Sequence, residues 1–367
     1  MKATVSQSDL ARGLSQVSRA LSSRVQLPVL NNVLVEAVKG GVTLSATNLE
    51  IGIRTHIGGK VTAEGALTVP ARSWTEFVTS LSGDNLELED NEMKLKVKAG
   101  KYQATFSGVD ASEFPVLPVH GSAGQAISSQ LLGQIASQVA YAAATDESRP
   151  VLTGIKFQRS GDNLAVVATD GFRLSRKLIP LDPKLAGLIT DLILPARTIS
   201  EVARIASESK EDQVTIESVI KNNQVIFSCA GTDLISRVLE GNYPDVEKII
   251  PSDLPVEAIL DRQEFTRSLK AASIFARENN NIVRFKITDA KFNISAQAAQ
   301  AGESEIEIEA ETTGEGEIAF NYKFVADVLG SLTSERVRLQ VKDHLSPGVF
   351  RPEKDDSLLA LVMPVRI

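Results

Sequence analysis

The sequence has little cysteine, little histidine and no long apolar run, and each shortage excludes a class of protein. The single cysteine, Cys229, excludes an internal disulfide and leaves a cysteine-based metal cluster without ligands. No apolar run approaches the ~18–20 residues that span a bilayer, and the first residues, MKATVSQSDLARGL, lack the apolar core of a signal peptide. We therefore expect a cytoplasmic protein with no membrane partner.

The side chains that usually carry catalysis are also few. The three histidines, His56, His120 and His344, lie far apart and lack the spacing of metal ligands. No P-loop, GxSxG or GxGxxG sequence stands between a strand and a helix. Asp170 would need a second carboxylate for acid–base work. The sequence therefore indicates neither an enzyme nor a cofactor, and a hydrolase built on Asp170 is a disfavoured alternative.

What the sequence does contain is one pattern that recurs three times. Each copy reads as a strand end, a Pro or Asn turn, a basic residue and an amphipathic helix. The basic residues Arg72, Arg197 and Lys323 are 125 and 126 residues apart, which indicates one unit used three times in 367 residues. The copies are VPARSWTEFVTSL (69–81), LPARTISEVARIAS (194–207) and the fainter IAFNYKFVADVLGSL (318–332).

Each copy follows another expected helix, so the chain reads as three domains. These first helices are expected at 8–21, capped by Ser8, at 128–143 and at 262–275. The Gly- and Ser-rich segment HGSAGQA and the segment NYPDVEKIIP mark two boundaries. ATDGFRL predicts a hairpin with a two-residue Asp-Gly turn. We expect α+β domains at 1–120, 121–251 and 252–367, each with two helices and antiparallel sheets.

The charges are unevenly distributed between the helices and the rest of the chain. The six expected helices carry ten basic and five acidic residues, which is a net charge of +5. The rest of the chain therefore carries a net charge of −12, since the whole chain has −7. Salt confines the attraction of phosphates to ~8–10 Å, so a locally basic surface can bind nucleic acid within an acidic protein. The helices lack a cluster of base-reading side chains, so such contact would be with the backbone. Ordinary solvated helix faces are the alternative.

Several motifs resemble those of the bacterial DNA sliding clamp, the beta subunit of DNA polymerase III, over the full length. The motifs are LPVLNNVLVE (27–36), ATDGFRL (168–174), VPAR, LPAR, FP and YPD before the boundaries, and LVMPVRI (361–367). The combination of ATDGFRL with a C-terminal VMPxR is the specific part. The resemblance implies a DNA clamp fold, with head-to-tail homodimers closing a ring around duplex DNA and the helices inside. It implies a processivity factor that slides without sequence preference and is opened by an ATP-driven clamp loader.

The resemblance also implies three sets of site residues. Phe172 replaces the commoner His, and Lys248 stands where some members have Arg, two departures that bear on peptide preference. The partners would be the DNA polymerase III catalytic subunit, the clamp loader, and other polymerases and repair proteins with clamp-binding peptides. The implied peptide groove uses Leu152, Thr169, Gly171, Phe172, Arg173, Leu174, Pro244, Lys248, Ile249, Ser346, Val362, Met363, Pro364, Val365 and Arg366. The implied DNA contacts are Arg24, Arg72, Arg149, Arg197, Arg204 and Arg277, and the implied dimer contacts are Ala104, Phe106, Ile274 and Phe275.

Other interpretations stay open from the residues alone. A tripled domain can serve stability only, Val362 and Met363 can be the core of an edge strand, and Ile274 with Phe275 can be internal core. A monomeric ligand-sensing or sugar-binding protein of three similar domains, with a small-molecule pocket, is the alternative from another class.

Overall fold

The computed structural model describes residues 1–21, 27–83, 85–121, 124–146, 148–183, 187, 189–219 and 223–366. The chain forms two compact units. Unit 1 comprises Met1–Gln130 and Glu201–Val238, and unit 2 comprises Leu131–Ser200 and Leu239–Ile367. Two helices, α3 (Ser129–Gln138) and α5 (Ala196–Ser209), begin in one unit and end in the other.

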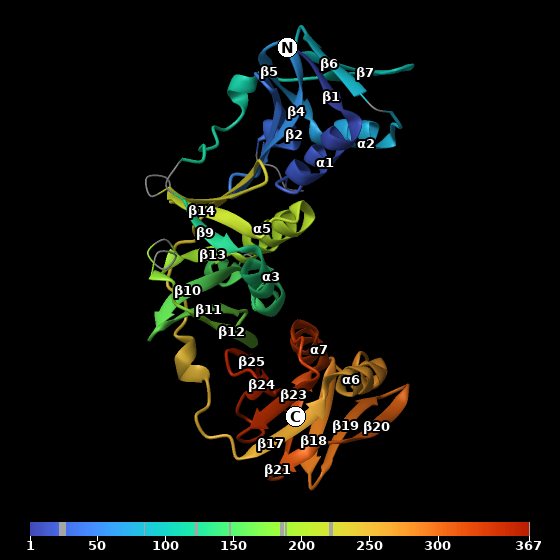
Figure 1. Cartoon of the computed structure of the whole chain (residues 1–367). Coiled ribbons are helices and arrows are strands. Elements are labelled where there is room, and N and C mark those ends of the chain that lie inside the picture. The colour runs from blue at the N-terminus through green and yellow to red at the C-terminus, as the bar shows by residue number, and fades with distance from the viewer. Residues whose placement is uncertain are drawn as a thin grey trace. The chain divides into compact units, whose positions relative to one another are not determined.

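Unit 1 is built on an antiparallel sheet in the order β8-β7-β6-β1-β4-β16-β15-β14-β9, to which β2, β3 and β5 are added through β2–β3, β3–β4 and β2–β5 pairs. The pairing of β16 with β4 joins strands that are far apart in the sequence. α1 packs beside α2 (Figure 1). The elements are β1 (Lys2–Ser6), α1 (Gln7–Ser18), η1 (Pro28–Asn31), β2 (Asn32–Val38), β3 (Gly41–Thr47), β4 (Ile51–Ala63), β5 (Gly65–Pro70), α2 (Ala71–Ser80), β6 (Asn85–Asn91), β7 (Lys94–Ala99), β8 (Tyr102–Ser107), η2 (Ala111–Glu113), β9 (Gln125–Ser128), β14 (Gln213–Val219), β15 (Gln224–Cys229) and β16 (Thr232–Arg237).

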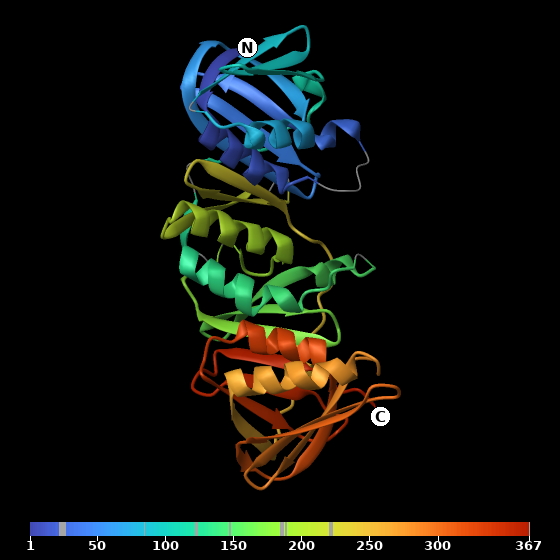
Figure 2. The ribbon, with the colours of Figure 1, turned by 90° about the vertical axis from the view of Figure 1, so that its right-hand side faces the viewer.

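Unit 2 contains a nine-stranded sheet in the order β13-β10-β11-β12-β25-β24-β23-β17-β21 and a four-stranded sheet in the order β20-β19-β18-β22. The β12–β25 pair joins distant parts of the chain, as β4–β16 does in unit 1. α6 and α7 lie side by side over the strands (Figure 2). The elements are η3 (Ala140–Ala142), η4 (Pro150–Thr153), β10 (Gly154–Ser160), β11 (Asn163–Thr169), β12 (Arg173–Pro180), β13 (Ile193–Pro195), η6 (Val246–Ile249), β17 (Val256–Asp261), α6 (Arg262–Ala276), β18 (Ile282–Thr288), β19 (Lys291–Ala298), β20 (Gly302–Glu309), β21 (Glu311–Thr313), β22 (Gly316–Asn321), α7 (Tyr322–Ser331), β23 (Arg336–Val341), β24 (Gly348–Pro352) and β25 (Leu358–Val362).

The amphipathic pattern of the first helix is confirmed, but its predicted cap is wrong. Leu10, Leu14 and Val17 are buried along one face of α1. The helix begins directly after β1, so Ser6 is the N-cap, and its hydroxyl accepts a hydrogen bond from the backbone N–H of Asp9 at 3.4 Å. Ser8 lies inside the first turn.

The segment expected to be helical from 128 to 143 is shorter. α3 ends at Gln138, and Val139 leaves the helical region with φ of −120° before the short 3-10 turn η3. The hairpin of β11 and β12 forms as predicted, but its connection is longer than two residues, because Thr169 pairs with Leu174. Side-chain hydrogen bonds of that connection explain the difference. In the part of the chain that the structure describes, no helix is both long and apolar enough to cross a bilayer.

Candidate functional site

The connection between β11 and β12 is a rigid turn held by two side chains. The Thr169 hydroxyl donates to the carbonyl of Arg173 at 2.6 Å and accepts from the N–H of Gly171 at 3.0 Å. One carboxylate oxygen of Asp170 accepts from the N–H groups of Phe172 and Arg173 at 2.8 and 2.9 Å. Gly171 has φ of +92°, which an L residue adopts only at a cost. The turn is therefore fixed before any partner arrives.

Arg173 anchors this turn instead of facing solvent. Its side chain is 12% exposed, and its Nε lies 3.0 Å from the Asp170 carboxylate while an Nη pairs with Asp327 of α7. Its guanidinium lies 5.0 Å from the ring centroid of Phe324 and 5.6 Å from that of Tyr141. Cation–π contacts of this kind add to the ion pairs. The guanidinium therefore fastens the turn to α7 and η3.

Phe172 is the side chain that the turn presents. It is 60% exposed and stacks on Phe324, with ring centroids 6.3 Å apart and planes 18° from parallel. Its carbonyl accepts a hydrogen bond from the N–H of Met363 at 2.8 Å, so the residues after β25 lie along the turn. Met363 is 37% exposed. An exposed aromatic ring and a thioether thus stand together on a fixed backbone, and we call this surface, with Thr169 to Arg173 and Met363, the unit 2 turn site.

The floor beside the turn is apolar. Leu174, Val246 and Leu361 belong to one buried cluster, against which Tyr243 packs. The Tyr243 hydroxyl accepts the N–H of Thr169 at 3.1 Å. Burial raises the pKa of Tyr243, and burial likewise raises the pKa of Tyr141 to about 12, so both phenols stay protonated at neutral pH.

The remaining predicted groove residues divide between interior and rim. Leu152, Thr169, Leu174 and Val362 are buried, whereas Ile249 is 45% exposed and Lys248 pairs with Asp245 at 2.9 Å. Pro364 and Ser346 are half-buried, and Pro244 is exposed. The N–H of Val365 donates to the carbonyl of Ala319 in β22 at 2.8 Å. Val365 and Arg366 line a separate pocket of about 790 Å³ with Leu345 and Ile318.

The predicted basic residues are exposed wherever the structure describes them. Arg24 lies outside the described residues. The other five, Arg72, Arg149, Arg197, Arg204 and Arg277, are exposed. Several of them have partners, because Arg72 pairs with Glu76 at 2.9 Å, Arg204 pairs with Glu201 at 3.2 Å, and Arg277 Nε donates to the hydroxyl of Tyr322 at 3.3 Å. Their charge is available on the surface but partly neutralised.

Arg19, which the sequence suggested as part of a basic helix surface, is largely buried and paired with glutamates. This side chain is 20% exposed and donates two hydrogen bonds to the carboxylate of Glu208, at 2.8 and 3.3 Å. It also forms an ion pair with Glu201 at 3.9 Å. Arg19, the C-cap of α1, thereby joins the end of that helix to α5 within unit 1 and adds little to a basic surface. Arg267 and Lys270 of α6, by contrast, are exposed and add positive charge to the surface of unit 2.

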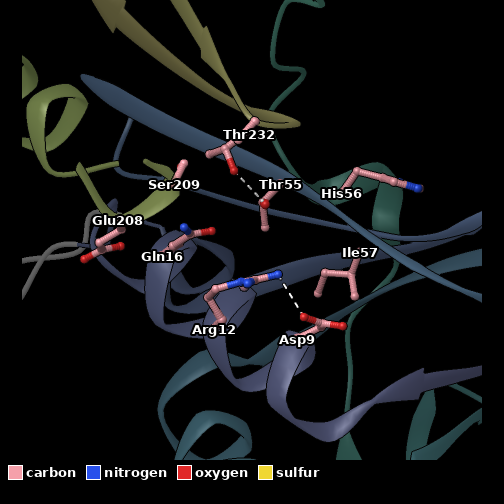
Figure 3. Close-up of a pocket in the computed structure, with 11 residues that line it drawn as sticks. Asp9, Arg12, Gln16, Thr55, His56, Ile57, Glu208, Ser209 and Thr232 are labelled. Atoms are coloured by element: carbon pink, nitrogen blue, oxygen red, sulfur yellow. Dashed lines mark hydrogen bonds and ion pairs between the residues drawn. The ribbon is translucent and has the colours of Figure 1, made fainter. Parts of the chain in front are cut away.

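Unit 1 contains a pocket of about 220 Å³ beside α1 (Figure 3). Its charged groups already pair with neighbours, Arg12 with Asp9 at 2.8 Å and Glu208 with Arg19. The buried Gln16 amide faces the pocket. No group of three or more metal-ligating side chains occurs among the described residues.

Each of the two predicted interface segments lies at or beside a sheet edge. β8 ends the sheet of unit 1 and carries Ala104 and Phe106, whose ring packs on Phe77 at 5.8 Å. In unit 2, Ile274 of α6 is 60% exposed, while Phe275 is half-buried against the core. Ile274 is therefore available to a partner, and Phe275 supports it from inside.

Comparison with known proteins matches three family models along the chain. They are the N-terminal, central and C-terminal domains of the DNA polymerase III beta subunit, at residues 1–118, 126–245 and 247–366. The chain belongs to the DNA polymerase III beta subunit family. The predicted fold of three similar α+β domains is thereby confirmed.

Relatives match this chain over its whole length. The beta sliding clamp of Synechocystis is 34% identical with 100% of both chains covered, and that of Staphylococcus aureus is 28% identical with 100% of this chain and 99% of the relative covered. The solved DNA polymerase sliding clamp from Bacillus subtilis is similar with a TM-score of 0.92 and 28% identity, covering 100% of this chain and 99% of that one. The beta chain of DNA polymerase III from Streptococcus pneumoniae has a TM-score of 0.91 and 27% identity, with 100% of both covered.

Sequence reasoning missed the side chains that support the unit 2 turn site. Tyr141, Phe324 and Asp327 hold Arg173 and Phe172, although they come from η3 and α7, far from the turn in the sequence. Phe324 and Asp327 lie in the third copy of the repeat, which was the available signal. Their role depends on which residues the β12–β25 pairing brings together, and the repeat does not give that pairing.

Proposed function

We propose that this chain is the processivity clamp of a bacterial DNA polymerase III. The observation that carries the proposal is the match of all three domain models together with sliding-clamp structures that cover 100% of the chain. In this function two chains close a ring around duplex DNA, and the ring tethers a polymerase to its template. Tethering raises the effective concentration of a weakly bound enzyme. The domains would be 1–120, 121–251 and 252–367.

The ring would form by head-to-tail contact between the two sheet edges. β7, next to the edge strand β8, presents the exposed Lys94, Lys96 and Lys98 at alternate positions. The edge strand β20 presents four exposed glutamates, Glu303, Glu305, Glu307 and Glu309. Unpaired edges invite strand addition, and opposite charges across the joint favour this pairing over pairing of like edges. A heterologous contact of this kind makes a ring when the rotation closes.

DNA would meet exposed basic helix residues. The supporting residues are Arg72, Arg197 and Arg204 on the second helices of the first two domains, Arg277 at the end of α6, and Arg149 in a loop. Arg24 is proposed with them from the sequence alone. Contacts to phosphates alone carry no sequence information, and contacts through water let a ring slide. The double substitution Arg72→Glu with Arg197→Glu should weaken DNA contact and leave peptide binding unchanged. Loss of peptide binding with DNA contact intact would contradict this assignment.

The unit 2 turn site would receive the partners. Phe172, Met363 and Ile249 give an exposed apolar rim above a buried apolar floor, which suits leucine and phenylalanine of an extended peptide. The DNA polymerase III catalytic subunit, the clamp loader and other polymerases and repair proteins would share it. Because the chain would act through binding alone, we propose a non-catalytic subunit that works in the cytoplasm, where a bacterial chromosome is replicated.

Small-angle scattering of the purified chain tests the ring. We expect twice 39.4 kDa, which is 78.8 kDa, with a hollow distance distribution. Lys96→Glu should shift the equilibrium to monomer, and Lys96→Glu with Glu305→Lys should restore part of it. A compact monomer of 39.4 kDa at every concentration would exclude the closed ring and favour the monomeric sensing protein.

A further inference from the structure

The turn of the unit 2 turn site occurs a second time, in unit 1. There the Thr47 hydroxyl donates to the carbonyl of Ile51 at 2.9 Å and accepts from the N–H of Leu49 at 3.0 Å. The side-chain oxygen of Asn48 accepts from the N–H groups of Glu50 and Ile51 at 3.1 and 2.9 Å. These bonds match one for one those made by Thr169 and Asp170 in unit 2.

The backbone follows the same path at both turns. Leu49 has φ of +76°, where Gly171 has +92°. The N–H of Arg237, at the end of β16, donates to the carbonyl of Glu50 at 2.9 Å, as the N–H of Met363 donates to Phe172 at 2.8 Å. Glu50 and Arg237 are thus the counterparts of Phe172 and Met363. We call Thr47 to Ile51 with Arg237 the unit 1 turn site.

The surroundings of the two sites are repeated as well. In each unit one arginine holds the segment that follows the domain: Arg54 donates to the carbonyls of Leu117 and Pro118 at 3.1 Å, and Arg176 pairs with Glu247 at 2.8 Å. In each unit a side chain of that segment fills the floor. Val246 packs with Leu174 in unit 2. In unit 1 a Cβ on Gly52 would lie 2.9 Å from Leu117, so that leucine covers the strand.

The two sites differ in the side chains that they present. Phe172 is 60% exposed and Met363 is 37% exposed, and both are apolar. Glu50 and Arg237 are exposed, and among the described residues neither side chain has an ion-pair partner. An apolar peptide laid on the unit 1 turn site would therefore cover two charges without replacing the water that solvates them, which is unfavourable.

We propose that Glu50 and Arg237 are specificity-determining residues that keep apolar partner peptides off the unit 1 turn site. Each chain then binds one such peptide at unit 2, although its fold provides two similar sites. The consequence for a ring of two chains is two tethered partners. This inference rests on the proposed function of the unit 2 turn site. Without the charged pair, the repeated turn would lead us to expect two peptide sites in each chain.

Exchanging the side chains between the sites tests the inference. The probe is a short fluorescein-labelled peptide that carries adjacent leucine and phenylalanine, titrated calorimetrically into the full-length protein. The wild type should bind one peptide per chain. Glu50→Phe with Arg237→Met should bind two per chain, and the reciprocal Phe172→Glu with Met363→Arg should bind at least about tenfold more weakly at its one site. If the variant Glu50→Phe with Arg237→Met folds poorly, Glu50→Leu with Arg237→Leu tests the same replacement of charged by apolar side chains.

A matched control places the same side chains on a surface without the turn. Glu64→Phe with Lys60→Met changes two exposed residues, Lys60 near the far end of β4 and Glu64 directly after that strand, and should leave one peptide per chain. A wild type that binds two peptides per chain would overturn the inference, and so would folded Glu50→Phe, Arg237→Met protein that still binds one. A wild type that binds none would overturn the proposed function itself, so the two failures are distinct.

Discussion

Arg173 should be the most sensitive residue of the unit 2 turn site. Substitution by leucine keeps the volume of the aliphatic stem and removes the guanidinium. The Asp170 carboxylate, whose side chain is 15% exposed, then loses its cation at 3.0 Å but keeps the two backbone N–H groups. The pairing with Asp327 and the contacts with Phe324 and Tyr141 disappear as well.

The expected cost follows from how buried each contact is. A charge-assisted hydrogen bond to a buried carboxylate contributes about 1.5–3 kcal/mol, and the cation–π contacts about 0.5–2 kcal/mol. Asp327 is 50% exposed, so its pairing contributes at most about 1 kcal/mol. We therefore expect Arg173→Leu to lower the free energy of unfolding of unit 2 by about 4 kcal/mol. The matched control, Asp327→Asn, should cost about 1 kcal/mol or less.

Urea unfolding separates the two units in one experiment. Trp74 is the single tryptophan and is fully buried in unit 1, so its fluorescence reports that unit, whereas circular dichroism reports both. Arg173→Leu should lower the dichroism midpoint of unit 2 by about 1–2 M urea and leave the Trp74 transition in place. Equal effects of Arg173→Leu and Asp327→Asn, or a shift of the Trp74 transition, would refute the reasoning.

The other predictions concern single groups in each unit. Burial raises the pKa of Tyr141 to about 12, so between pH 10 and 12 the folded protein keeps a proton that the unfolded chain loses, and unit 2 should lose stability as the pH rises through this range. Thermal melts of Tyr141→Phe should show a smaller loss of stability, and an unchanged loss would contradict the assignment. Gly171→Ala should destabilise unit 2 by about 1 kcal/mol, and Leu49→Gly should stabilise unit 1 by about 0.5 kcal/mol, because both positions have positive φ; denaturation midpoints check both signs. Burial raises the pKa of the Cys229 thiol, so a disulfide reagent at pH 8 should modify it slowly until urea opens unit 1, and fast labelling of the native protein would argue against this burial.

The repeat and the periodicity of the sequence determined much of the fold. Helix faces such as Leu10, Leu14 and Val17 recur at helical spacing and are buried as that spacing requires. The threefold recurrence of a basic residue before an amphipathic helix indicated three domains, because a repeated local pattern can be recognised in the sequence without knowledge of any long-range contact. The motif ATDGFRL predicted the turn that proves central, since Thr, Asp and Gly are the residues that such a turn needs.

Which charges stay on the surface and which side chains the turns present depend on contacts between segments that lie far apart in the sequence. Arg19 looks like a basic surface residue in the sequence, yet Glu208 neutralises it from α5, a partner 189 residues away. The equivalence of Glu50 with Phe172 depends on β4 pairing with β16 and β12 with β25. Pairing between strands this far apart depends on the packing of whole sheets, whereas a turn or a helix face is encoded by residues that are neighbours in the chain.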